Sequence, residues 1–341
     1  MSRTLAVIEG AVAPLDFARA RVLRAFASPF AGLFASRDRR VALYGALTVV
    51  TAFAIASVFP FWALFLGPVV LGIPHLVADV RYLVVRPGLH KRGLAWAIAA
   101  LPLAYTAFRP VPSVGLAAGF VVIAACNATL VRRGVALALW AAFYAVVASH
   151  DRIASYVFVH AHNLLAIALW WSWRAKRSPA QRWTLVLFAL ATIAIFAGGS
   201  DALLAFATSK LSFSPVSSKA LTRVVAGLAP VSSDSLALHL VLFFAFSQGV
   251  HYATWLRLVP EDDRRRAGIR SFASSARALV ADMGLPVLLV ALAVATGIAA
   301  WAVFDLPRAT NGYFRVASFH GYLEIAVALR CLVEWKRPSE P

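Results

Sequence analysis

Three long apolar stretches constrain the fold of this chain more than any other feature of its sequence. They cover residues 41–85, 94–131 and 135–173, and 61% of the 341 residues are hydrophobic while only 14% are charged. Soluble domains are about 45–50% apolar and about 25% charged. Because a membrane-crossing helix needs about 20 mostly apolar residues, the sequence predicts an all-α, polytopic transmembrane helical bundle.

Turn residues and charged residues divide the apolar sequence into about ten predicted spans. These lie near residues 41–59, 61–85, 93–108, 112–131, 135–149, 154–173, 183–198, 232–256, 281–304 and 316–334. With their connections they form a single polytopic membrane domain over residues 41–336. At about 20 residues for each span, the chain has no room for a separate water-soluble domain.

The net charge of +18 is unevenly distributed over the connections between these spans. If the N-terminus is cytoplasmic, 26 of the 33 lysines and arginines lie on the cytoplasmic side and seven on the other side. Short cytoplasmic loops are enriched in these residues. The pattern therefore indicates an inner (plasma) membrane of the bacterial type with both termini in the cytoplasm. It favours anionic membrane lipids, and not nucleic acid, as partners of the basic charge.

Residues 1–40 combine basic and apolar side chains in an amphipathic pattern. Arg19, Arg21 and Arg24 lie between Leu15, Phe17 and further apolar residues. Such a pattern is typical of a helix that lies on an anionic membrane surface. The alternative is a disordered basic tail.

Two of the longer connections carry their own predictions. Residues 199–231 form an outer loop of moderate polarity, which predicts a short helix or re-entrant cap, with a plain loop as the alternative. The segment from Pro260 to Arg270 is mixed in charge and predicts a solvated connection near lipid headgroups.

Histidines inside the predicted spans are the clearest sign of chemistry. Of eight histidines, six lie on the second, sixth, eighth and tenth spans, namely His75, His160, His162, His239, His251 and His320. A charged or histidine side chain at membrane depth is costly, about 2.5–3.5 kcal/mol for a charged residue on insertion scales. All four spans run from outside to inside in the predicted topology. The set therefore indicates a transition-metal site, expected to hold Fe(II), because imidazole is a common ligand of iron, copper and zinc.

Helix geometry limits which of these histidines can meet. His160 and His162 are about 200° apart around a helix, so only one faces the bundle centre, and His162 is the deeper one. His239 and His251 differ by about 120° and about 18 Å, so they cannot both bind one ion. We therefore expect His75, His162, His239 and His320 as the ligands, with His160 and His251 as further candidates. The alternative is that the histidines are separate interhelical hydrogen-bonding residues.

Two carboxylates accompany the histidines at helical spacing. Asp79 follows His75 by four residues, and Glu324 follows His320 by four residues. Each pair therefore shares one helix face. A carboxylate beside a histidine either orients the imidazole or binds the metal directly. We predict that Asp79 and Glu324 are catalytic residues that orient the ligands.

The segment from Leu71 to Asp79, Leu-Gly-Ile-Pro-His-Leu-Val-Ala-Asp, resembles a known family signature. It is similar to the Gly-x-Pro-His-Gly-x-x-Asp motif of the Brp/Blh family of membrane β-carotene 15,15′-dioxygenases, with Leu76 in place of the second glycine. The resemblance implies a helical bundle in which histidines from several helices hold iron and a carotenoid is cleaved into two retinals.

These observations predict a membrane metalloenzyme. We expect a histidine-ligated non-haem iron oxygenase, such as a dioxygenase, that acts on a carotenoid-like or other lipophilic substrate. The competing function is a membrane transporter or channel in which the same His, Asp and Glu side chains couple to protons or ions.

The charge distribution makes the topology testable. Reporter fusions at Met1 and at Pro341 should both report a cytoplasmic location, because 26 of the 33 basic residues then lie inside. An external signal from either fusion would contradict the proposed topology.

Overall fold

A computed structural model describes residues 3–26, 31–174, 178–211, 218–231, 233–264 and 268–340. In these ranges the chain forms helices and turns and contains no strand. The predicted all-α bundle is therefore confirmed.

Eight helical segments of the described chain are long enough and apolar enough to cross a membrane. They are α3 (Arg37–Val58), α4 with its π-helical extension (Pro60–Val85), α8 (Leu130–Ser149), α9 (Asp151–Ser172), α10 (Pro179–Phe196), α13 with its continuation into α14 (Asp234–Asp262), α16 (Leu285–Phe304), and α17 with α18 (Leu306–Glu334). Two shorter apolar segments are α5 (Leu94–Tyr105) and α6 with α7 (Pro112–Ala125). Each of the ten predicted spans overlaps one of these segments, while the number of crossings stays a prediction.

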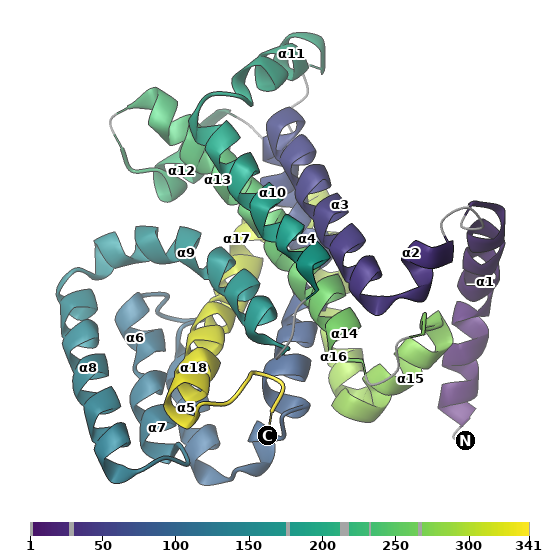
Figure 1. The fold of residues 1–341 in the computed structure, drawn as a ribbon. Coiled ribbons are helices and arrows are strands. Elements are labelled where there is room, and N and C mark those ends of the chain that lie inside the picture. Colours follow the sequence, from purple (N-terminus) through teal and green to yellow (C-terminus); the bar gives the residue numbers. More distant parts are fainter. Residues whose placement is uncertain are drawn as a thin grey trace.

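Helix α13 lies at the centre of the arrangement (Figure 1). It packs against α3, α4, α9 and α10. In its segment, Asp234–Asp262, 72% of the most apolar stretch is buried, whereas the corresponding share for α16 at the periphery is 6%. Helix α18 packs against α5, α7 and α9 on the other side. The interior of the bundle is therefore bounded by α4, α9, α13 and α18.

The N-terminal helix α1 (Arg3–Phe26) packs against α15 (Phe272–Met283). The Asp16 carboxylate accepts hydrogen bonds from the backbone N–H groups of Phe272 (2.7 Å) and Ala273 (3.0 Å), which lie in the first turn of α15 and have no partner within that helix. These hydrogen bonds, that of Ala273 foremost, lower the pKa of Asp16. Leu15 and Phe17 are exposed.

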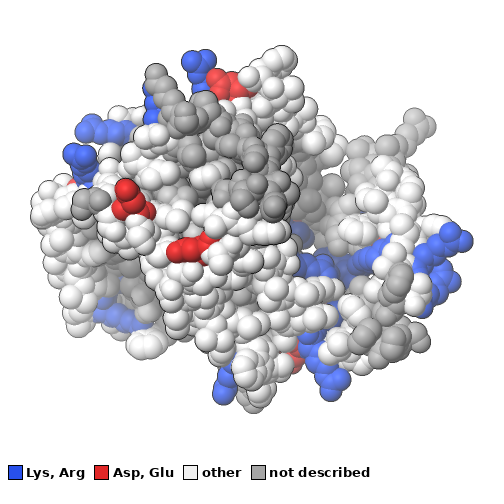
Figure 2. All heavy atoms as spheres, turned by 90° about the horizontal axis from the view of Figure 1, so that it is seen from above, with Lys and Arg blue, Asp and Glu red and all other residues white. Residues whose placement is uncertain are grey.

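Basic side chains gather over this region, at the right of Figure 2, where Figure 1 places α1 and α15. Residues 1–2 and 27–30 of the predicted amphipathic segment lie outside the described residues. The described part of the segment is helical, and its location on a membrane surface stays a prediction.

Two short helices occupy residues 199–231, the segment predicted as an outer loop. They are α11 (Asp201–Leu211) and α12 (Ser218–Leu228), and residues 212–217 between them lie outside the described residues. Figure 1 places both at the top of the bundle, beyond the ends of α10 and α13.

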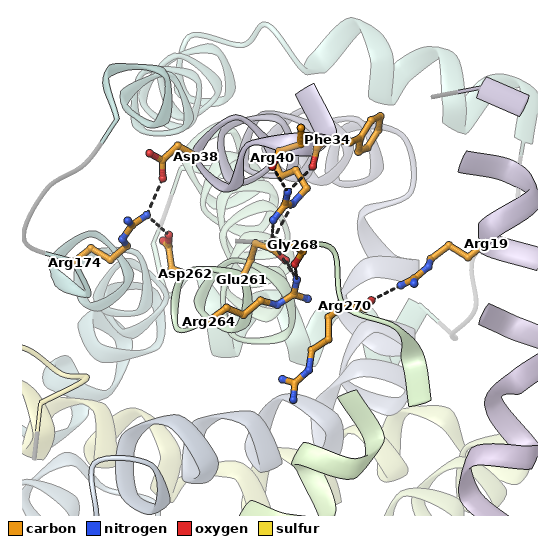
Figure 3. A network of polar contacts seen from close by, with 11 residues as sticks. Arg19, Phe34, Asp38, Arg40, Arg174, Glu261, Asp262, Arg264, Gly268 and Arg270 are labelled. Atoms are coloured by element: carbon orange, nitrogen blue, oxygen red, sulfur yellow. Dashed lines mark hydrogen bonds and ion pairs between the residues drawn. The ribbon is translucent and has the colours of Figure 1, made fainter. Parts of the chain in front are cut away.

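The expected solvated connection is wrong for the first residues after Pro260, because Glu261 and Asp262 are buried, whereas Gly268 and Ile269 further along are exposed. Glu261 and Asp262, in α14 (Val259–Asp262), are 1% and 4% exposed. Glu261 accepts hydrogen bonds from Arg40 Nε (3.0 Å) and Nη2 (2.8 Å). Arg174 lies between Asp38 (2.7 Å) and Asp262 (3.5 Å) (Figure 3).

These contacts join α3, α9 and α14 at one end of the bundle. The Trp170 indole N–H of α9 also donates to Asp262 (2.7 Å). The sequence around Pro260 could not reveal this, because the partners are about 90 to 220 residues away in the chain. We call Arg40, Asp38, Arg174, Glu261 and Asp262 the inner ion network.

We expect the buried pair in this network to contribute strongly to stability. Replacing Glu261 by Gln removes the carboxylate that the buried Arg40 side chain binds, and breaking a buried pair costs about 3–5 kcal/mol. Thermal unfolding of the purified protein in detergent should therefore show a clearly lower Tm. The matched control is Glu340→Gln, because the Arg337–Glu340 pair is 45% and 42% exposed and such pairs contribute about 0–1 kcal/mol. Equal effects of the two substitutions would contradict this account.

Candidate metal centre

Four helices bring four histidine rings together in the interior. His75 comes from α4, His162 from α9, His251 from α13 and His320 from α18. The His75 ring centroid lies 4.9 Å from that of His320 and 5.4 Å from that of His251. The His162 ring lies 5.3 Å from His251 and 5.4 Å from His320. We call these residues the histidine cluster.

Asp79 completes a set of donor atoms suited to one ion. His75, Asp79, His251 and His320 each offer a ligand atom, and these atoms all lie within 4.8 Å of one another. Two imidazole nitrogens bound to one ion, each at about 2.0–2.1 Å, are at most about 4.2 Å apart. Small side-chain movements would therefore bring all four donors to a single ion.

Backbone carbonyls fix the protonation of two cluster imidazoles. His162 Nδ1 lies 3.2 Å from the carbonyl oxygen of Phe158, and His320 Nδ1 contacts that of Ala317. A carbonyl oxygen only accepts, so in both rings Nδ1 carries the hydrogen and Nε2 keeps a free lone pair. Metal-binding histidines use this arrangement, in which the second ring nitrogen donates to a neighbouring acceptor.

His75 has a similar partner on its Nδ1 side. The Tyr313 hydroxyl lies 3.3 Å from His75 Nδ1. His75 Nε2 has no hydrogen-bond partner in the described part of the chain and lies 3.7 Å from Asp79 Oδ2. Gly72 permits this contact, because a Cβ atom at that position would lie 2.3 Å from the Tyr313 ring. The glycine three residues before His75 therefore allows α17 to approach α4.

The remaining buried atoms of the centre have few partners. Both nitrogens of His251 and both carboxylate oxygens of Asp79 make no hydrogen bond with any described residue. Glu324 accepts one hydrogen bond from the Trp255 indole (2.6 Å), and its Oε1 lies 3.8 Å from His251 Nε2. Buried polar atoms nearly always have a partner in native proteins. This concentration of unpaired nitrogens and oxygens is therefore what a metal-binding site is expected to show.

The charges of the two buried carboxylates also favour a metal-binding site. Asp79 and Glu324 are both 0% exposed, and neither forms an ion pair with Lys or Arg in the described part of the chain. Burying an unpaired carboxylate costs several kcal/mol. A divalent cation at the cluster would balance both negative charges, so the residues fit such an ion.

Short π-helical segments follow two of the four helices of the site, α4 and α13. Helix α4 becomes π-helical over Val80–Val85, directly after Asp79, and α13 becomes π-helical over Thr254–Leu258, shortly after His251. Single π-helical turns occur frequently at functional sites. A π-helical turn changes the direction in which the following side chains point, so the residues after each turn no longer share a helix face with the histidine before it.

The structure places His251, and not His239, in the cluster. His239 Nε2 instead lies 3.2 Å from Asp201 Oδ1. Measured from the first residue of their helical segments, His320, His75 and His251 lie 14, 15 and 17 residues in, whereas His239 lies five residues in. The sequence places His320 too close to the end of its span, because α17 begins at Leu306, ten residues before the predicted span at residue 316.

The other histidines also lie apart from the cluster. His160 Nε2 lies 2.9 Å from the carbonyl oxygen of Leu228, so this side chain contacts α12. His90 and His150 contact nearby backbone carbonyls in exposed positions. Tyr313 and Trp255 belong to the site although no sequence pattern indicated them.

A cavity of about 730 Å³ leads from the cluster to the surface. Its lining includes His162, His251 and His320 at one end and the exposed residues Arg223 and Asn311 at the other. Apolar parts of its wall are formed by Phe65, Phe158 and Phe244. Small-molecule sites have volumes of about 300–1,000 Å³ and mainly apolar walls. The cavity is therefore large enough to bring a sizeable organic molecule to the histidines.

No protein-family model matches this chain, and no match was found among curated proteins or solved structures. The resemblance to the Brp/Blh signature is carried by the segment from Leu71 to Asp79, whose His75 and Asp79 both lie in the candidate centre. The chemistry of the site is therefore interpreted from its residues and their geometry.

Proposed function

We propose that this protein is a membrane metalloenzyme in which His75, Asp79, His251 and His320 hold one transition-metal ion. The observation that carries this proposal is that these four side chains offer ligand atoms within 4.8 Å of one another, beside a cavity that His251 and His320 line. Buried atoms of His75, Asp79 and His251 have no hydrogen-bond partner among the described residues. His162 and Glu324 lie beside this set.

The donor set favours Fe(II). Imidazole binds iron, zinc, copper and nickel well, and a combination of histidines with one carboxylate and open positions is typical of non-haem iron oxygenases. Neither cysteine is in the set, which disfavours thiolate-selective ions. When bound, iron supplies the activation of dioxygen.

The proposed substrate is lipophilic, either carotenoid-like or another lipid. The phenylalanine-rich wall supports this, and the Brp/Blh resemblance implies oxidative cleavage of a carbon–carbon double bond. In that reaction the C=C and O–O bonds break and each carbon receives one oxygen atom, so no external reductant is needed. The protein residues would hold the double bond beside the ion and exclude water.

The inner ion network argues against the transporter or channel alternative. None of its five residues lines the cavity, which extends from the cluster toward α12 and α17. A transport path needs access from both sides of the membrane. The buried Arg40–Glu261 pair instead joins the helices at the opposite end.

The membrane placement belongs to the same proposal. An inner membrane with both termini in the cytoplasm puts the basic surface of α1 beside anionic lipid headgroups. The cavity mouth at α12 and α17 then lies on the outer side.

Metal content tests the centre directly. The protein, purified without added chelator, should carry close to one equivalent of iron by elemental analysis. His75→Ala, His251→Ala and His320→Ala should each lose most of it, because each removes a large share of the binding energy.

His239→Ala is the matched control, since it removes a histidine of the same helix as His251 and should retain the metal. His90→Ala should also retain it. Metal-free wild-type protein, or loss of metal on changing His239 but not His251, would contradict the proposed ligand set.

The two carboxylates should behave differently. Asp79→Asn should reduce metal content as strongly as loss of a histidine, because Asp79 belongs to the donor set. Glu324→Gln should weaken metal binding by about 10–100-fold, as expected for a residue that acts on a ligand. Titration of the metal-depleted variants with Fe(II) measures both effects. The reverse order would exchange the two roles.

A further inference from the structure

Gln248 is a buried polar side chain of the cavity that the proposed metal centre does not use. It lies on α13, three residues before His251, and it lines the cavity while only 5% exposed. No hydrogen bond joins its amide to any other described residue. The neighbouring polar side chains, in contrast, have hydrogen-bond partners. The Asn163 amide donates to Ser247 Oγ (3.2 Å), and this hydroxyl donates to the carbonyl of Phe244 (3.3 Å).

An unpaired amide at this depth needs a partner. Leaving a polar group without a partner costs about 1–3 kcal/mol. The cavity is the space that the amide borders, so its partner belongs to whatever occupies the cavity. A carboxamide offers an acceptor oxygen and an NH₂ donor side by side. A hydroxyl group, which both donates and accepts, is the simplest group that pairs with it reciprocally.

We infer that Gln248 binds a hydroxyl group of the substrate, so that the substrate is a long-chain or polyene alcohol and not a pure hydrocarbon. This inference deepens the proposed function and rests on the cavity being the substrate site. Residues three apart on a helix have Cβ atoms about 5–6 Å apart. The hydroxyl therefore lies about one helical turn from His251, and the bond that reacts lies near the oxygenated end of the chain.

Tyr252 lies at the same place but already has a neighbour for its hydroxyl. It lines the cavity and is 3% exposed, and its hydroxyl interacts with that of Tyr313. Its ring lies 4.6 Å from that of His75. Gln248 is therefore the polar group that remains for a ligand at this part of the wall, which is otherwise rich in phenylalanine.

The experiment compares two probes that differ only in the hydroxyl. All-trans-retinol and all-trans-retinyl methyl ether share one fluorescent polyene, but only the alcohol has a hydrogen to donate. Binding to the purified protein is measured by fluorescence under nitrogen, which prevents turnover. We expect the wild type to bind the alcohol about tenfold more tightly, which corresponds to about 1.4 kcal/mol.

Gln248→Met keeps the side-chain volume and removes the hydrogen-bonding groups, so it should reduce this preference to less than about twofold. Leu64→Met, at another buried position of the cavity wall, is the matched control and should keep the full preference. Equal binding of both probes by the wild type, no binding of either, or an unchanged preference in Gln248→Met would overturn the inference.

Metal analysis of the same samples separates this inference from the proposed function. Gln248→Met should retain the metal content of the wild type, because Gln248 is not in the donor set. A wild type that prefers the alcohol but contains no metal would refute the metalloenzyme and leave the hydroxyl site standing. A metal-loaded protein without the preference would do the opposite.

Discussion

Two carboxylates buried among imidazole rings are the strongest physical constraint on the interior of this protein. Asp79 and Glu324 are fully excluded from solvent, in a medium where an uncompensated charge costs several kcal/mol. In the proposed metal centre, a cation held by donors from several helices would balance these charges. The close passage of α17 over Gly72 and the π-helical turns after Asp79 and His251 lie in the same region.

The architecture was largely predictable, because membrane helices are governed by one-dimensional rules. Apolar length and loop charge need no knowledge of tertiary contacts. The same rules failed at the segment before the last predicted span. Helix α17 is amphipathic and contains Pro307, Arg308 and Arg315, so residues 306–315 fall between two predicted spans although they are helical and partly buried.

The candidate site was predictable in residue type but not in membership. The even-numbered spans supplied all the histidines of the cluster, and the helical spacing of His160 and His162 already limited one choice. His251 could not be preferred over His239 from sequence, because depth depends on where a helix begins and how it tilts. Tyr313 was missed, because contacts between distant helices leave no local pattern.

The two ends of the bundle are held together by very different means, and this has a consequence for motion. At one end, buried ion pairs join α3, α9 and α14. At the other, α12 packs on α13 and α9 and accepts the hydrogen bond from His160 at the Leu228 carbonyl, and its described side chains are at least partly exposed. Local opening is cheapest where few buried contacts must be broken. Opening of the bundle is therefore expected to cost less at α12, whose residues Arg223 and Gly227 line the cavity, than at the inner ion network.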